Sequence, residues 1–220
     1  MIKYCIFDLD GTLFNTLTTI THYMNMTLSS HGIATISEEE CCSFIGHGAR
    51  TLMKRALMSK GIVDDEFSAK LLLEYNTAYN KDTLYLTKPY DGIPEMLDAL
   101  KKNGVRLGVL SNKPDDTTNI IISSFFGGLF DDVRGGRAGV ALKPSPEAVN
   151  MMIADSGFSA DEVMFIGDTK VDIETGIAAH VGAAVGVSWG FRTREELAIA
   201  GATVIADTPS DIVSEVLSRA

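Results

Sequence analysis

The strongest constraint on the fold is a change of pattern near residue 89. From there to the end of the chain, short apolar runs of strand length alternate with helical patterns. Parallel strands separated by helices need crossover connections, so this alternation predicts a mostly parallel sheet with helices on its faces. The strands expected in this part lie at residues 105–110, 163–166 and 183–187, with shorter ones near Val133 and Thr203.

A first strand is expected much earlier, at residues 3–7, where an apolar run ends at Asp8. Between this run and residue 82 the signals are helical: apolar residues recur at three- and four-residue spacing, Ser37 is placed to cap a helix, and no convincing strand occurs. We therefore predict an α/β fold with a Rossmann-like, mostly parallel sheet core and an inserted all-helical cap domain. The expected domains are residues 1–14 with 84–220 for the core and residues 15–83 for the cap.

Composition and charge limit the kinds of partner. The 220 residues are 45% hydrophobic and carry 19 Lys and Arg against 29 Asp and Glu. The resulting net charge of −10 repels a phosphodiester backbone, which argues against nucleic acid. No apolar run has the length of a membrane span or the form of a secretory signal, so we expect a cytoplasmic protein without membrane contact. Cys5, Cys41 and Cys42 match neither a disulfide framework nor a zinc site.

Acidic residues follow two of the predicted strands. Asp8 and Asp10 follow the first strand, and Asp168 and Asp172 follow the strand at 163–166. Because the carboxyl ends of parallel strands meet at one edge of a sheet, these carboxylates predict an oxygen-lined site suited to Mg²⁺. The spacing of Asp168 and Asp172 would let both share one helical face, with Lys170 as a cation between them. Either pair alone is also compatible with a solvated turn or an acidic helix start.

Two further segments indicate phosphate binding. Ser111 and Asn112 end the strand at 105–110 just before a helix, where hydroxyl and amide donors can meet an anion. Lys143 begins the sequence Lys143-Pro144-Ser145-Pro146, a rigid extended loop that would hold a positive charge at a fixed point. An ordinary polar turn and a solvated lysine are the alternatives.

Other nucleophile and nucleotide motifs are incomplete. Residues 186–190 match G-x-S-x-G, but no histidine follows the serine, because the last histidine is His180. Neither a P-loop nor a complete G-x-G-x-x-G after a strand occurs. These patterns exclude the corresponding serine hydrolase, P-loop and dinucleotide-binding functions.

Four segments, taken in order, resemble the four motifs of the haloacid dehalogenase superfamily. They are Asp8-Leu9-Asp10-Gly11-Thr12-Leu13, Ser111-Asn112-Lys113-Pro114, Lys143-Pro144-Ser145-Pro146 and Gly167-Asp168-Thr169-x-x-Asp172. The helical insert resembles the C1-type cap of that superfamily. Two further segments resemble the phosphoglycolate phosphatase branch of the superfamily: Ile45-Gly46-His47-Gly48-Ala49-Arg50 and Pro89-Tyr90-Asp91-Gly92.

The resemblance implies a Mg²⁺-dependent phosphatase that hydrolyses a small phosphorylated metabolite, with phosphoglycolate as the leading substrate, through an aspartyl phosphate. It implies that Asp8 is the nucleophile and that Asp10 is the general acid and base. Mg²⁺ would be held by Asp8, the backbone carbonyl of Asp10 and Asp168, with Asp172 in or near its ligand shell. Thr12, Ser111, Asn112 and Lys143 would bind the phosphoryl group, with Lys143 also serving catalysis.

Three positions bear on substrate choice and on the hinge. Gly48 and Arg50, at the start of a helix expected over residues 48–59, would receive a second anion such as the carboxylate of phosphoglycolate. A surface glycine-rich loop is the alternative. Asn15 stands where relatives often carry Asp, so this chain lacks a carboxylate between core and cap.

Two other functions use the same residues. A phosphomutase resembling β-phosphoglucomutase would return the phosphoryl group to a sugar, whereas Thr12 resembles the phosphatase version of the first motif. A phospho-aspartate regulatory module would share the acidic pocket, but the cap and the second acid, Asp10, favour hydrolysis. The sequence is compatible with a monomer or a homodimer.

Overall fold

The computed structural model describes residues 1–219, so residue 220, the last residue of the predicted core domain, lies outside the described residues. The chain forms two compact units. We call residues 1–15 together with those from 89 onward the core unit, and residues 16–88 the helical unit. Each unit has its own buried apolar cluster.

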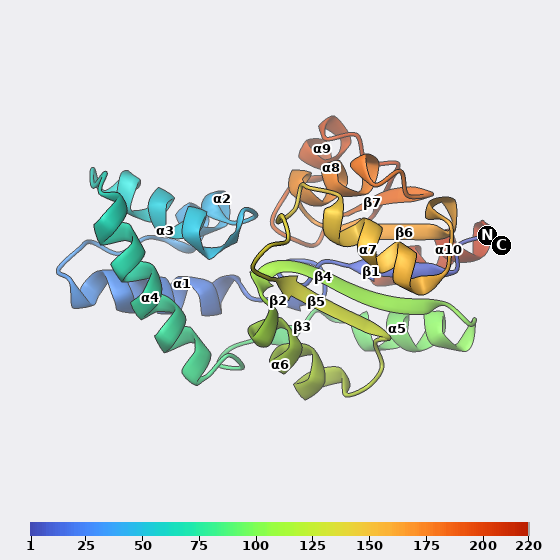
Figure 1. The fold of residues 1–220 in the computed structure, drawn as a ribbon, viewed down its shortest axis with the longest axis horizontal. Helices are drawn as coiled ribbons and strands as arrows, with labels where there is room; N and C mark the ends of the chain where they lie inside the picture. The colour runs from blue at the N-terminus through green and yellow to red at the C-terminus, as the bar shows by residue number, and fades with distance from the viewer. Residues whose placement is uncertain (220) are drawn as a thin grey trace. The chain divides into compact units, whose positions relative to one another are not determined.

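The core unit is built on a six-stranded sheet of order β5-β4-β1-β6-β7-β8 (Figure 1). Every strand pair in this sheet is parallel. This architecture confirms the predicted α/β class with a parallel sheet and a helical insertion after the first strand. The strands are β1 (Tyr4–Phe7), β4 (Arg106–Pro114), β5 (Asp132–Gly136), β6 (Val163–Gly167), β7 (Ala183–Val187) and β8 (Val204–Ala206).

Helices connect the strands of the core unit and cover the sheet. Two elements, α9 and the short 3-10 helix η1, were not expected, although each begins at a capping box, Thr193 with Glu196 and Ser159 with Glu162. Both are too short for a clear apolar period, which explains why the sequence pattern missed them. The helices are α5 (Ile93–Lys102), α6 (Asp115–Phe126), α7 (Glu147–Ser156), η1 (Ala160–Glu162), α8 (Lys170–Ala178), α9 (Arg194–Ile199) and α10 (Pro209–Ser218).

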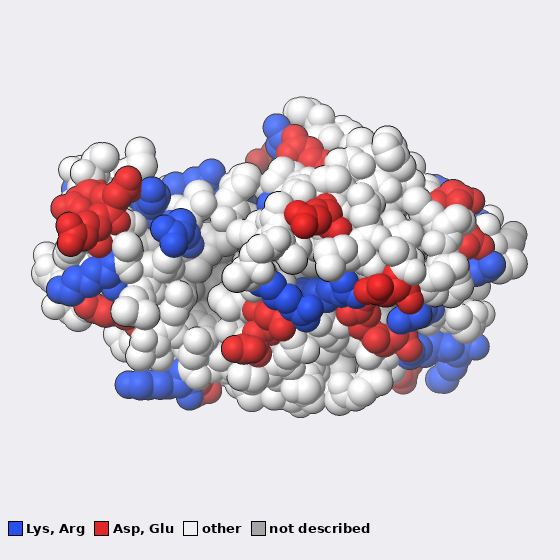
Figure 2. Space-filling model, viewed as in Figure 1, with Lys and Arg blue, Asp and Glu red and all other residues white. Residues whose placement is uncertain are grey.

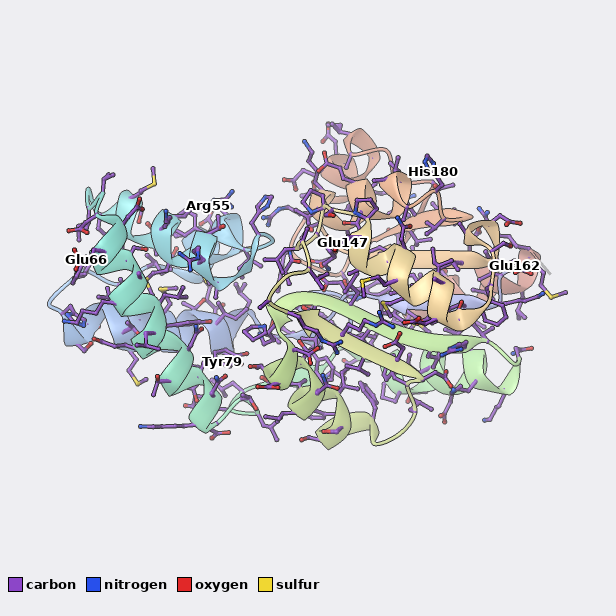
Figure 3. The ribbon with its side chains drawn as sticks, in the orientation of Figure 1. Arg55, Glu66, Tyr79, Glu147, Glu162 and His180 are labelled. Carbon is purple, nitrogen blue, oxygen red and sulfur yellow. The ribbon has the colours of Figure 1, made fainter. Side chains whose placement is uncertain are left out.

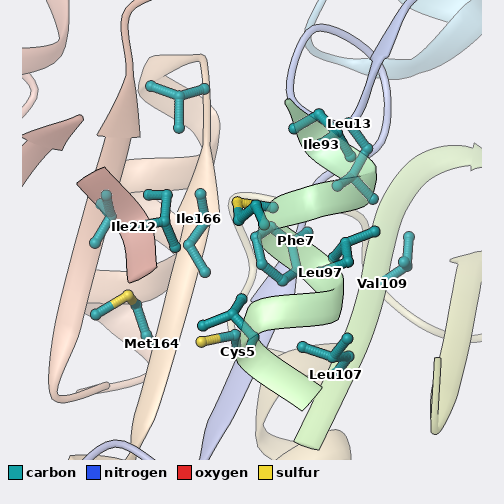
Figure 4. Close-up of a cluster of buried hydrophobic side chains, with 14 of the residues drawn as sticks. Cys5, Phe7, Leu13, Ile93, Leu97, Leu107, Val109, Met164, Ile166 and Ile212 are labelled. Carbon is teal, nitrogen blue, oxygen red and sulfur yellow. The ribbon is translucent and has the colours of Figure 1, made fainter. Parts of the chain in front are cut away.

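The side chains of β1 alternate between two apolar layers, one on each face of the sheet. Cys5 and Phe7 belong to the layer that also holds residues of α5, α6 and α10, while Tyr4 and Ile6 pack with residues of α7. Burial on both faces explains why β1 reads as a continuous apolar run. The first layer is drawn in Figure 4, with Leu13, Ile93, Leu97, Leu107, Val109, Met164, Ile166 and Ile212 among the labelled residues.

The helical unit contains α1 (Leu17–Ser30), α2 (Glu38–Phe44), α3 (Gly48–Ser59) and α4 (Asp65–Lys81). As expected from the sequence, Ser37 caps α2 in a capping box with Glu40. The Arg55 guanidinium, labelled in Figure 3, donates a 3.0 Å hydrogen bond to the Phe44 carbonyl and so joins α3 to the end of α2. The apolar interior includes Met24, Leu28, Met53, Leu57 and Leu71.

The expectation that no strand occurs between the first strand and residue 82 is wrong. Two short strands, β2 (Phe14–Asn15) and β3 (Lys88–Pro89), form a separate two-stranded sheet, and β2 lies within that stretch. Two-residue strands carry no alternation for a sequence pattern to detect.

Charged side chains of both signs are interspersed on the face shown in Figure 2. This distribution, with the net charge of −10, offers no extended basic surface there for a phosphodiester backbone. Among residues 1–219, no helix is both long and apolar enough to span a membrane.

Candidate active site

The candidate site lies at the carboxyl ends of three neighbouring strands of the core unit. Phe7, the last residue of β1, pairs with Val109 of β4 on one side and Ile166 of β6 on the other. Asp8 follows directly, and its backbone N–H donates a 2.8 Å hydrogen bond to the Ile166 carbonyl. The polar residues that follow these strands therefore meet at one edge of the sheet, as parallel topology requires.

Three buried carboxylates gather at this edge. Each of Asp8, Asp168 and Asp172 offers an oxygen, and these oxygens all lie within 4.8 Å of one another. The side chains are almost fully enclosed, with relative exposures of 8%, 0% and 1% for the three residues. A compact set of carboxylate oxygens is the donor chemistry that Mg²⁺ prefers, so the residues present fit this ion.

Glycine at position 11 is required for the close approach of the two acidic loops. Gly11 has φ +88°, and a Cβ atom built there would overlap Asp168 Oδ2. A Cβ atom on Gly190 would overlap the Asp168 side chain in the same way. Backbone from two different loops thus packs directly against the Asp168 carboxylate.

Lys143 is the cation inside the cluster. Its buried Nζ lies 2.8 Å from Asp8 Oδ1 and 2.7 Å from Asp172 Oδ1. The expectation that Lys170 lies between the acids is wrong, since Lys170 is exposed and pairs with Glu174 at 3.3 Å, one turn along α8.

The site is buried and has an excess of negative charge, and both shift its pKa values. Burial, together with the Asp172 and Asp10 charges, raises the pKa of Asp8 to about 7, even though Lys143 opposes the shift. Burial and the neighbouring Asp172 and Asp8 raise the pKa of Asp168 well above its usual range. Burial lowers the pKa of Lys143, but the two adjacent carboxylates outweigh it and the net shift is upward. Additional positive charge is therefore favourable here.

Hydrogen bonds fix the orientation of Asp168. Thr12 Oγ1 donates to Asp168 Oδ1 at 3.0 Å, and the Phe191 backbone N–H donates to Oδ2 at 2.8 Å. The Trp189 indole N–H donates to the Thr12 carbonyl at 3.0 Å and so joins the two loops. Thr12, predicted to bind phosphate, is thus engaged with the Asp168 carboxylate.

Asp172 is held by the first turn of α8. Its Oδ2 accepts hydrogen bonds from the Thr169 backbone N–H at 3.0 Å and from Thr169 Oγ1 at 2.7 Å. Asp168 precedes the cap residue Thr169 and so lies outside the helix. The expectation that both acids share one helical face is therefore wrong: a loop residue and a third-position helix residue meet instead.

The side chain of Asn112 is engaged with the backbone of Lys143. Asn112 Nδ2 donates to the Lys143 carbonyl at 3.0 Å, and the Lys143 backbone N–H donates to Asn112 Oδ1 at 2.8 Å. Ser111 is buried, and its Oγ accepts a 3.2 Å hydrogen bond from the Lys113 N–H. Glu147, labelled in Figure 3, accepts from the Ala141 N–H at 3.1 Å, two residues before Lys143.

Sequence reasoning missed the partner of Asp10. Lys113 Nζ lies 3.1 Å from Asp10 Oδ1 and 3.0 Å from Oδ2, and both side chains are largely buried. Lys113 belongs to the second motif, but its role depends on β4 continuing to Pro114 instead of ending at Leu110 as expected. Asp10 contributes no carboxylate to the compact acidic cluster, and metal binding by its carbonyl stays a prediction.

The two predicted substrate residues of the insert belong to the helical unit. Gly48 is the first residue of α3 and has φ +78°, and Arg50 is exposed in the first turn of the same helix. Their predicted contact with a substrate anion is a proposal, taken up below.

Comparison with known proteins identifies relatives across the chain. Residues 5–185 match the family described as haloacid dehalogenase-like hydrolase. A phosphoglycolate phosphatase of Rhodospirillum rubrum is 34% identical over 215 residues, which cover 94% of this chain and 88% of that protein. One from Haemophilus influenzae is 34% identical over 193 residues, covering 84% and 85%. The crystal structure of a predicted phosphoglycolate phosphatase from Haemophilus somnus has a TM-score of 0.90 at 27% identity and covers 97% of both chains.

The family match covers most of the chain, and the relatives extend over most of both lengths. These findings confirm the superfamily and hydrolase class that the four sequence motifs predict, and they confirm the similarity to phosphoglycolate phosphatases. The chain therefore belongs to the haloacid dehalogenase-like hydrolase family.

Proposed function

We propose that this hydrolase is a Mg²⁺-dependent phosphatase that acts on a small phosphomonoester through a phosphorylated Asp8. The observation that carries the proposal is the contact of the buried Asp8 carboxylate with the Lys143 ammonium, inside a cluster completed by Asp168 and Asp172. A carboxylate placed among cations can attack a phosphate dianion that would otherwise be repelled.

In the first half-reaction, an Asp8 carboxylate oxygen attacks phosphorus and the bond from phosphorus to the ester oxygen breaks. Asp10 donates its proton to the departing oxygen, which leaves as an alcohol. In the second half-reaction, water attacks the phosphorus of the aspartyl phosphate and gives a proton to Asp10. The bond between phosphorus and Asp8 breaks, which releases inorganic phosphate and restores both carboxyl groups to their starting states.

The cations compensate the charge that this chemistry concentrates. When bound by Asp8, the Asp10 carbonyl and Asp168, with Asp172 nearby, Mg²⁺ would neutralise charge on the transferring phosphoryl oxygens. Lys143 binds the same oxygens from its position beside Asp8. Ser111 donates its hydroxyl to them, because its buried side chain lies near the carboxyl end of the neighbouring strand β4.

Thr12 and Asn112 contribute mainly through other residues. Thr12 holds the Asp168 carboxylate by a hydrogen bond from its side chain, and Asn112 holds the Lys143 backbone. Direct contacts of these two residues with the phosphoryl group are secondary in this proposal.

We propose phosphoglycolate as the leading substrate. Similarity to proteins named phosphoglycolate phosphatase over most of this chain supports it. Arg50, in the first turn of α3, carries a positive charge that suits the second anion of this substrate, its carboxylate, and Gly48 opens the same helix.

The test is phosphate release from a panel of phosphomonoesters, with Mg²⁺ and then with EDTA. Metal-dependent release, fastest with 2-phosphoglycolate, is the expected result. Conversion of β-glucose 1-phosphate without net phosphate release would instead identify a phosphomutase. A long-lived phosphorylated protein without repeated turnover would identify a regulatory module.

A further inference from the structure

The ion pair between Lys113 and Asp10 is not explained by the mechanism above. The relative exposures of the two side chains are 8% for Lys113 and 16% for Asp10. The ammonium nitrogen is equally close to both carboxylate oxygens, at 3.1 and 3.0 Å. Charge-assisted hydrogen bonds of this kind hold a carboxylate more strongly than hydrogen bonds between neutral groups do.

The backbone around Lys113 is held by several independent contacts. Thr118, fully buried in α6, donates its hydroxyl to the Lys113 carbonyl at 3.3 Å and to the Pro114 carbonyl at 3.0 Å. The Lys113 N–H donates to Ser111 Oγ at 3.2 Å. A Cβ atom on Gly135 of β5 would lie 2.6 Å from the Lys113 carbonyl oxygen, so β5 passes directly against this segment.

The irregular end of β4 gives Lys113 its direction. The pairing of β4 with β5 shifts register between Leu110 and Pro114. Such irregularities change the direction in which a side chain points and are often found beside active sites. Through this shift, one strand end supplies Ser111 to the phosphate side of the site and Lys113 to Asp10.

Each acid of the first motif therefore has its own lysine. Lys143 contacts Asp8, and Lys113 contacts Asp10. Lys113 lies near the end of β4 and Lys143 lies in the loop before α7, so their charges are not interchangeable.

We propose that Lys113 is a positioning residue that fixes the orientation of the Asp10 carboxyl group for both proton transfers. This inference rests on the proposed function, because it assigns Lys113 a part in the same reaction. It predicts that loss of Lys113 affects the steps that need a proton transfer by Asp10 and spares the attack by Asp8.

The experiment compares wild type with Lys113→Met, Lys113→Arg and Asp10→Asn on two substrates, in the presence of Mg²⁺. The alcohol of 2-phosphoglycolate needs a proton as it leaves, whereas the p-nitrophenolate of p-nitrophenyl phosphate does not. Rapid mixing measures release of the leaving group in the first turnover, and steady-state assays measure release of phosphate.

We expect Lys113→Met to slow the first turnover of 2-phosphoglycolate by roughly 10- to 100-fold, as for a misplaced catalytic group. The rate of the same step with p-nitrophenyl phosphate is expected to change by less than about threefold. The later release of phosphate from this substrate is expected to be slower than in the wild type. Lys113→Arg should restore most of the 2-phosphoglycolate rate. Adding Lys113→Met to Asp10→Asn should cause no further loss, because the two residues act as a unit.

Lys101→Met is the matched control. Lys101 also pairs with an aspartate, Asp131, at 2.7 Å, but beside Leu107 near the amino end of β4. Both substrates should react at the wild-type rate in this variant. The ratio of the two substrate rates within one preparation does not depend on the fraction of protein that is folded, so a folding defect cannot imitate the expected pattern.

Three results would overturn the inference. The first is a wild-type rate for Lys113→Met on 2-phosphoglycolate, and the second is an equal loss of rate on both substrates. The third is a double variant whose loss of rate is the product of the losses in Lys113→Met and Asp10→Asn. If the wild type itself releases no phosphate with Mg²⁺, the proposed function fails and this inference fails with it. An active wild type, an impaired Asp10→Asn variant and an unchanged Lys113→Met variant would overturn the positioning role alone.

Discussion

The Asn112 side chain hydrogen-bonds to both the N–H and the carbonyl of Lys143. Asn112 and Lys143 lie 31 positions apart in the sequence. A residue at the end of one strand thereby fixes the backbone of a lysine in the loop before α7. With its backbone held in this way, Lys143 places its ammonium group between Asp8 and Asp172.

Replacing Asn112 with Ala should reduce both activity and stability. Two partly buried hydrogen bonds are lost, which we expect to lower the free energy of unfolding by about 1–3 kcal/mol. A displaced Lys143 should lower kcat/KM by roughly 10-fold or more. Thermal unfolding and steady-state kinetics measure the two effects.

Asn119→Ala is the control for that variant. Asn119 donates one exposed hydrogen bond to the Asp115 carbonyl, at 2.9 Å. Its loss should change stability by less than about 0.5 kcal/mol and leave kcat/KM unaltered. Equal effects of the two substitutions would refute the role of Asn112.

Gly11→Ala should damage the metal site. The new Cβ atom would overlap Asp168 Oδ2, and φ +88° is unfavourable for alanine. Gly104→Ala has a similar backbone cost, with φ +76°, but its Cβ atom would meet no neighbour within 4 Å. We expect Gly104→Ala to lose about 1–2 kcal/mol of stability and keep its Mg²⁺ affinity.

Gly11→Ala should lose more stability than Gly104→Ala and bind Mg²⁺ more weakly. The chain's single tryptophan, Trp189, hydrogen-bonds to the Thr12 carbonyl and provides a fluorescence signal for the Mg²⁺ titration. Indistinguishable titrations of Gly11→Ala and the wild type would contradict the close approach of these loops.

Stability without metal should fall as the pH rises from about 4 to about 7. Burial raises the pKa of Asp8 to about 7 and also raises the pKa of Asp168. Between the unfolded pKa of about 3.9 and the folded value, the folded chain binds more protons than the unfolded chain, so stability declines with increasing pH. Mg²⁺ bound at the proposed site should offset this loss by replacing protons as the positive charge.

The increase in Tm caused by Mg²⁺ should therefore be larger at about pH 7.5 than at about pH 5. Thermal unfolding with MgCl₂ or EDTA at the two values measures this difference. The same increase at both values would show that the carboxylates are not protonated in the metal-free protein.

Arg50→Ala should raise KM selectively for substrates that carry a carboxylate. The reason is the loss of the proposed charge-assisted contact with the second anion, and a 10-fold change in KM corresponds to about 1.4 kcal/mol. Kinetics with 2-phosphoglycolate and with a neutral alkyl phosphomonoester provide the comparison. An equal loss on both would remove Arg50 from substrate recognition.

The sequence predicts the parallel sheet well, because apolar runs between helical patterns directly report burial on both faces. It also predicts that Asp8 and Asp168 follow strands, since strand ends are visible where an apolar run meets an acid. Local sequence patterns do not show how a strand pairs with another strand that is distant in the sequence. The irregular pairing with β5 extends β4 to Pro114, and this extension places Lys113 beside Asp10.

The same limit explains the misassigned cation. Lys170 is close to Asp168 and Asp172 in the sequence, but it lies in the first turn of α8 with an exposed side chain. Lys143 is distant in the sequence and reaches the acids because Asn112 holds its loop at the neighbouring strand end. Tertiary hydrogen bonds, which no periodicity encodes, decide which lysine is used.

The most direct test of the proposed chemistry is to locate the phosphoryl group during turnover. Wild-type protein is mixed with 2-phosphoglycolate and Mg²⁺, quenched in acid within the first turnover, digested, and analysed by mass spectrometry. We predict one phosphoryl group on Asp8, absent from Asp8→Asn, whose turnover falls to background. Phosphorylation of another residue, or substantial turnover by Asp8→Asn, would contradict the assignment of Asp8 as the nucleophile.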